Sequence, residues 1–135
     1  MTTLRFVNPP GLYDPAPNGY SHLAIVPPGS RLVLVAGQGG ETADGRLSPD
    51  FATQVRQALS NMRVALAAAG AEPRHVARLL VLVVDHSEER LHVLGAELDR
   101  VWGDAPKAAC TLVPVPRLAL DGMLFEIEAT ALVPA

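Results

Sequence analysis

The stretch between Leu47 and Asp85 has the clearest pattern of hydrophobic and polar positions in the chain. Its first half repeats apolar residues at steps of three and four, which places them on one face of a helix. These residues are Phe51, Val55, Ala58, Leu59, Met62, Ala65, Leu66 and Ala69. The polar residues expected on the opposite face are Thr53, Gln54, Arg56, Gln57, Ser60 and Arg63. Ser48 is predicted as the N-cap with Pro49 at the first helical position, and Gly70 as the residue that ends the helix.

The pattern changes after Pro73, where a strand is predicted over residues 76–84. Leu79 to Val84 form an unbroken aliphatic run, which is typical of a strand covered on both faces. A helix with one apolar face followed by such a strand predicts a sheet with this helix laid across it.

The remaining elements follow from shorter patterns. Ser87 is predicted to cap a second helix, whose apolar stripe ends at Trp102 before Gly103. The predicted strands are Leu4–Val7, His22–Val26, Arg31–Ala36, Ala109–Val115 and Met123–Val133. We expect the second and third of these to form a hairpin. Pro114 and Pro116 place the Ala109 strand at an edge or at a bulge.

This order of elements predicts an α+β fold in a single domain covering residues 1–135. Two helices would cover one face of a mixed, mostly antiparallel six-stranded sheet. The other sheet face still carries leucine, valine and isoleucine, and no third layer of helices is available to cover it. We therefore expect another subunit to cover that face.

Composition narrows the class of protein. The chain has 135 residues, 49% of them hydrophobic and 19% charged, which is typical of a globular domain. A net charge of −3 without a clustered basic face argues against nucleic acid as a partner. The single cysteine suits a reducing compartment, and no signal-peptide core or membrane-spanning run is present. We expect a cytoplasmic protein without a membrane partner.

Several residues could carry chemistry. Cys110 could be a small buried hydrophobe, could line a pocket, or, less readily because no base accompanies it, could act as a nucleophile. Glu126 and Glu128 share one strand face, and they are either solvated or one of them positions a water in a cleft. Arg117 or Lys107 could hold a substrate carboxylate.

Two further patterns bear on possible binding sites. Residues 37–40 contain three glycines in four positions, which lets another group approach the backbone closely. They do not predict a phosphate loop, because neither a GK[ST] motif nor a helix follows. The histidines lack metal-ligand spacing, so no metal site is expected, but His22 begins a strand close to a glycine-rich segment and could line a pocket.

Three runs of residues resemble the reactive intermediate deaminase family, also called Rid or YjgF-like. They are Ala36-Gly37-Gln38, residues 54–62 (QVRQALSNM) with residues 67–71 (AAAGA), and residues 125–129 (FEIEA). Gly19-Tyr20-Ser21-His22 is similar to the entry strand of many members. The resemblance runs from about Ala16 to Val133, and its order of motifs is specific.

The resemblance implies a chorismate-mutase-like homotrimer with ligand clefts between subunits. It also implies hydrolysis of small imine or enamine carboxylates to a keto acid and ammonia, without a metal or organic cofactor. Cys110 falls on the cleft strand, and His22 falls where deaminating members carry a tyrosine. Glu128 falls at the water-positioning glutamate and is the catalytic candidate. The substrate-binding candidates are Tyr20, His22, Gly37, Gln38, Cys110 and Arg117.

One departure changes the expected activity. Deaminating members carry an arginine two residues before the cysteine, where it clamps the substrate carboxylate, and this chain has Ala108 there. Losing such a charge-assisted hydrogen bond costs about 1.5–3 kcal/mol of binding. Two hypotheses follow: a trimer that hydrolyses an imine or enamine without this clamp, or a non-catalytic trimer that binds a small molecule or has a regulatory role.

Overall fold

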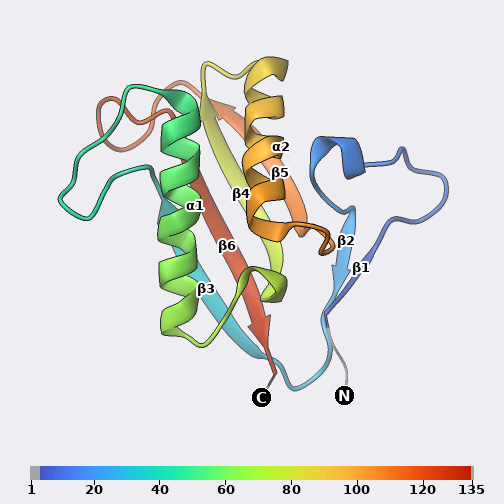
Figure 1. The fold of residues 1–135 in the computed structure, drawn as a ribbon. Coiled ribbons are helices and arrows are strands. Elements are labelled where there is room, and N and C mark those ends of the chain that lie inside the picture. The colour runs from blue at the N-terminus through green and yellow to red at the C-terminus, as the bar shows by residue number, and fades with distance from the viewer. Residues whose placement is uncertain (1–3, 135) are drawn as a thin grey trace.

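A computed structural model of the chain describes residues 4–134. Figure 1 shows the two long helices lying side by side across one face of a sheet, with a small pair of strands to one side. In chain order the elements are β1 (Arg5–Val7), η1 (Ala16–Asn18), β2 (Leu23–Ile25), β3 (Arg31–Gln38), α1 (Phe51–Ala68), η2 (Pro73–His75), β4 (Val76–Val84), α2 (Glu88–Trp102), β5 (Ala109–Val115) and β6 (Phe125–Val133).

The main sheet has four strands in the order β3-β6-β4-β5. Strand β6 is antiparallel to both β3 and β4, whereas β4 and β5 are parallel. The predicted α+β class, with two helices on one face of a mixed sheet, is confirmed. The proline-containing strand β5 lies at an edge, as predicted.

The six strands do not form one sheet, and the predicted hairpin between β2 and β3 is wrong. Strand β2 pairs with β1 in a separate two-stranded sheet, with Phe6 opposite Ala24. Strand β3 pairs instead with the longer strand β6, which offers backbone partners from Arg31 to Gln38. The two sheets are linked by one bridge, in which the Ser21 amide donates to the Ala108 carbonyl at 3.0 Å.

The end of α1 was predicted better than its start. Asp50, not Ser48, is the N-cap, and its carboxylate accepts hydrogen bonds from the backbone and hydroxyl of Thr53 at 2.9 and 2.7 Å. A carboxylate accepts these bonds more strongly than a hydroxyl, and its charge suits the positive end of the helix dipole. Gly70 adopts a φ of 73° just after the C-cap residue Ala69 and so ends the helix as predicted. The predicted cap of α2 is confirmed, because Ser87 accepts from the Arg90 amide at 3.1 Å.

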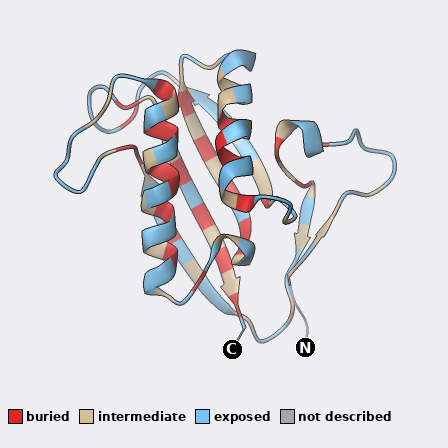
Figure 2. Cartoon of the chain, in the orientation of Figure 1, coloured by how far each residue is buried: buried red, intermediate tan, exposed pale blue. Residues whose placement is uncertain are grey.

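The core lies between the two helices and the sheet face they cover. Figure 2 shows buried residues along the inner sides of both helices and along β4 and β6. Fully buried side chains include those of Val55, Met62, Leu66, Val81, Phe125 and Ile127. Burying one such side chain stabilises the fold by about 1.5–3 kcal/mol, so this layer supplies most of the driving force for folding.

Gln54 was predicted on the solvent face of α1, but it is fully buried. Its Nε2 donates to the carbonyls of Ser48 and Gly122, at 2.7 and 2.9 Å. Its Oε1 accepts from the Leu124 amide at 2.8 Å. The side chain therefore joins the start of α1 to the loop before β6, and its burial is compensated by three hydrogen bonds.

The other face of the four-stranded sheet is uncovered in the single chain. It exposes Leu32, Leu34 and Val113, with Leu34 retaining 71% of its accessible surface. We call this surface the open face.

Between residues 4 and 134, no helix combines the length and apolar character needed to cross a membrane.

Candidate functional site

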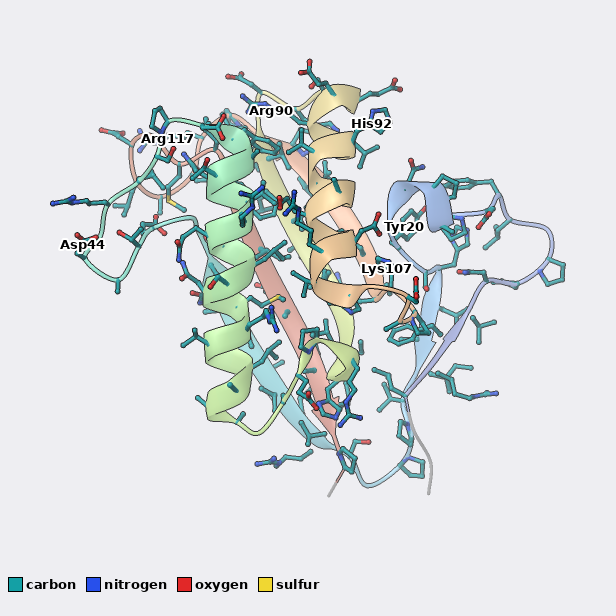
Figure 3. The ribbon with its side chains drawn as sticks, in the orientation of Figure 1. Tyr20, Asp44, Arg90, His92, Lys107 and Arg117 are labelled. Carbon is teal, nitrogen blue, oxygen red and sulfur yellow. The ribbon has the colours of Figure 1, made fainter. Side chains whose placement is uncertain are left out.

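A cavity of about 210 Å³ lies between α2, the segment around η1 and the edge of the sheet. Cys110 lies in register with the buried Leu79 and so faces the helices from β5. Figure 3 shows Tyr20 on the segment beside α2, facing that helix. The walls are mostly apolar and consist of Tyr13, Asn18, Tyr20, Val81, Leu91, Leu94, Leu98, Cys110 and Leu112.

Three rings gather beside this cavity. The ring of His22 meets those of Tyr13 and Tyr20 edge-on, with centroids 5.4 and 5.5 Å away. His22 Nε2 donates to the Tyr13 carbonyl at 2.8 Å, and the two tyrosine hydroxyls hydrogen-bond to each other. The hydrogen bond with Tyr13 raises the pKa of Tyr20 to about 12, so this hydroxyl keeps its proton even in mildly alkaline solution. His22 supports the wall of the cavity through Tyr20 and Tyr13.

Cys110 lines the cavity as a thiol. Burial raises the pKa of its side chain to about 12, because a thiolate would lose its hydration there. The thiolate is the nucleophilic form, so this environment opposes the nucleophile hypothesis and favours a role in shaping the wall.

A second group of candidates lies away from this cavity, around the end of β3. A Cβ atom placed on Gly37 would stand 2.7 Å from the carboxyl carbon of Glu126, so this glutamate lies against the glycine backbone. Glu128 lies on the same open face, opposite Leu80 of β4, and is exposed. Gln38 lines a groove beside α1, and its amide donates to the Ala36 carbonyl at 3.1 Å.

Neither predicted cation lines the Cys110 cavity. Arg117 pairs with Asp121 at 2.9 Å in the loop between β5 and β6, and Figure 3 shows it far from Tyr20. Lys107 pairs with Asp99 at 3.0 Å. Ala108 is buried where the arginine was expected, so the walls of this cavity contain no positive charge.

The candidates thus form two groups that one chain does not bring together. Cys110 and Tyr20 belong to the β5 edge and the helix side, whereas Gly37 and Glu126 belong to the β3 side and the open face. Among residues 4–134, no group of three or more His, Cys, Asp or Glu side chains could hold a metal ion.

Sequence reasoning missed two residues that belong to these surroundings. Tyr13 lies in a stretch rich in proline and glycine, so its sequence offered no pattern, although its hydroxyl reaches Tyr20. Arg78 interrupts the aliphatic β4 run and lies exposed, opposite Thr130 and Ala109. A lone charge within such a run was the signal that could have identified Arg78 as a residue of the open face.

The chain is similar to known proteins along most of its length. Residues 13–133 match the family described as Endoribonuclease L-PSP. The RutC family protein YjgH of Escherichia coli K12 is 32% identical over 103 residues, which are 76% of each chain.

Solved structures share this fold. The crystal structure of YyfB from Yersinia pestis, a Rid-family protein of unknown function, is 36% identical with a TM-score of 0.91, covering 98% of this chain and all of that one. TdcF of Escherichia coli, solved with bound serine, is 25% identical with a TM-score of 0.69 over 91% of each chain. Because these matches cover most of the chain, it belongs to the endoribonuclease L-PSP family of Rid or YjgF-like proteins.

Proposed function

We propose that the protein is a homotrimer whose clefts between subunits bind a small metabolite and hydrolyse an imine or enamine to a carbonyl compound and ammonia. One observation carries this proposal: β3 and β5, which bear candidate residues, are the two opposite edges of the sheet. We expect copies packed through the open face around a threefold axis to set the β3 edge of one subunit beside the β5 edge of the next, so that the Gly37 group and the Cys110 cavity meet in the cleft between them.

The open face supports assembly. Leu34 has 71% of its surface exposed, and Leu32 and Val113 are exposed on the same face. A second copy would remove this apolar surface from water. The helices occupy only the other face, so they cannot cover this one.

The chemistry requires a group that positions water. An enamine first takes a proton on carbon to become the imine. Water then adds to the C=N carbon, a proton passes from that water to nitrogen, and the C–N bond breaks to release ammonia and leave a carbonyl. Glu126 is the better-placed carboxylate, because it lies against the Gly37 backbone beside the expected cleft. Glu128, favoured by the family resemblance, is the alternative on the same face. General acid–base assistance of this kind contributes about 10²–10⁴-fold in rate.

The Cys110 cavity favours substrates without a clamped carboxylate. Its walls are leucine and valine with neutral hydroxyl and amide groups at one side, and Ala108 supplies no charge. We therefore expect weak or no activity on 2-aminoacrylate-type imines. TdcF binds serine in its crystal structure, which supports a ligand of about amino-acid size for this fold.

The second candidate function is a non-catalytic trimer that binds a small molecule. The thiol form of Cys110 and the mostly apolar cavity walls favour it. Ammonia release from imines that an amino-acid oxidase generates in situ distinguishes the two.

That assay should include imines of amino acids, made by the amino-acid oxidase, and imines of neutral amines, made by an amine oxidase, with Glu126→Gln and Glu128→Gln as matched variants. The enzyme hypothesis predicts turnover that Glu126→Gln removes and Glu128→Gln largely retains. The reverse result assigns the role to Glu128. The absence of protein-dependent ammonia release from every imine supports the binding trimer.

A further inference from the structure

A groove of about 180 Å³ runs between α1 and α2 on the outer side of the helix layer, away from both candidate groups described above. Arginines from both helices face it, together with a serine hydroxyl. Its lining residues are Arg56, Leu59, Ser60, Arg63, Glu97, Arg100 and Val101. We call it the arginine groove.

The floor of the groove is a buried carboxylate. Glu97 retains 4% of its accessible surface and accepts hydrogen bonds from Arg56 Nε at 3.0 Å and Nη2 at 2.8 Å. Arg100 Nε lies 3.4 Å from the same Glu97 oxygen, Oε1. A buried charge needs such partners, and in return it fixes the orientation of the two guanidinium groups.

The groove carries more positive charge than its acidic residues neutralise. Three arginines line it, against Glu97 in the floor and Asp50, whose carboxylate acts on Arg56 from the start of α1. Arg63 lies two helical turns beyond Arg56, about 10 Å along the axis. Within residues 4–134, Arg63 forms no ion pair with an acidic side chain. The ion pair between Arg56 and Glu97 is enough to hold the two helices together, so that structural role does not explain the other two arginines.

We propose that the arginine groove is a binding site for the phosphate groups of a small phosphorylated molecule. Guanidinium groups bind phosphate oxygens in pairs of parallel hydrogen bonds, and the Ser60 hydroxyl adds a neutral donor. Three arginines around one groove suit a ligand with several phosphate oxygens better than one with a single carboxylate. The groove lies on the helix side, so assembly through the open face leaves it accessible, and the site does not depend on the imine chemistry.

Calorimetric titration with pyrophosphate tests this proposal on the intact protein at low ionic strength. Wild type should bind it saturably, and both Arg63→Gln and Arg100→Gln should weaken binding about tenfold, which corresponds to the loss of one charge-assisted hydrogen bond. Arg46→Gln is the matched control, since Arg46 is an exposed arginine that pairs with Asp44 in a distant loop. It should bind as wild type does.

Three results would overturn the proposal: no saturable binding of pyrophosphate, an equal loss in Arg46→Gln, or equally tight binding of acetate. A short single-stranded RNA that displaces pyrophosphate and binds more tightly would assign the groove to nucleic acid instead. The melting temperatures of Arg63→Gln, Arg100→Gln and Arg46→Gln should match that of wild type. Weaker binding would then come from the lost guanidinium group and not from partial unfolding.

Discussion

The Glu126 side chain on β6 rests against Gly37 on β3, where any Cβ atom would stand 2.7 Å from its carboxyl carbon. The φ angle of Gly37 is not among the positive ones, so its backbone would accept other residues. The glycine is therefore required by the glutamate beside it and not by a turn. This contact joins the glycine-rich segment to the carboxylate that we propose positions water.

Gly37→Ala tests that contact. The added methyl group should displace the Glu126 carboxylate and lower imine turnover about as much as Glu126→Gln, by about 10²-fold or more. The free energy of unfolding should change little, because the displaced group is the end of a flexible side chain. Steady-state ammonia release together with urea unfolding gives both quantities.

Gly95→Ala is the matched control for that variant. Gly95 lies within α2, and a Cβ there would meet no atom within 4 Å. Alanine should stabilise the helix by about 1 kcal/mol and leave turnover unchanged. Full activity in Gly37→Ala would contradict the proposed role of the Glu126 contact.

Gln54→Ala should be strongly destabilising. It removes three hydrogen bonds and leaves the Leu124 amide and two carbonyls without their partner, in a site that is fully buried. We expect a loss of about 3 kcal/mol or more in the free energy of unfolding, measured by urea denaturation at fixed protein concentration.

Gln57→Ala, one turn further along α1, provides the comparison. Its amide donates to Asn61 on the same helix at 2.9 Å, with no other partner among residues 4–134, and it is half-buried. This change should cost well under about 1 kcal/mol. Equal effects of the two substitutions would show that Gln54 does not hold the loop before β6.

Cys110 should resist alkylation. With its pKa raised from 9.0 to about 12, the thiolate fraction at pH 8 is small, and iodoacetamide should react more than about a hundredfold slower than with a free cysteine peptide. The native thiol keeps its proton where the unfolded chain loses it, so stability should fall as the pH rises from 9.0 toward 12. A rate equal to that of the peptide would place the thiol in solvent.

The sequence predicts the main elements because their patterns are long. The eighteen residues of α1 repeat their apolar positions often enough to exclude other periods, whereas β4 is recognised by a nine-residue stretch that is rich in β-branched residues and short for a helix. Strand β2 has three residues, and nothing local in them decides between β1 and β3 as partner. That choice depends on β6, about a hundred residues later in the chain, which offers β3 the longer ladder.

The candidate site could be predicted only in part, because it also depends on contacts between segments that are far apart in the sequence. The alternation along β6 correctly places Glu126 and Glu128 on one face, but which of them meets Gly37 depends on the bulge between Val35 and Gln38. Gln54 looked like a surface residue because a glutamine side chain gives no sign of the distant backbone groups that it bonds.

The central claim is that the open face joins copies of this chain into a trimer, and multi-angle light scattering tests it directly. Leu34→Glu on the open face is compared with Val64→Glu on α1, because the two side chains are exposed to nearly the same extent, 71% and 70%. At low micromolar concentration, wild type and Val64→Glu should have three times the 14.3 kDa mass of the chain, whereas Leu34→Glu should be a folded monomer. A wild-type monomer, or a Leu34→Glu variant that remains a trimer, would contradict it.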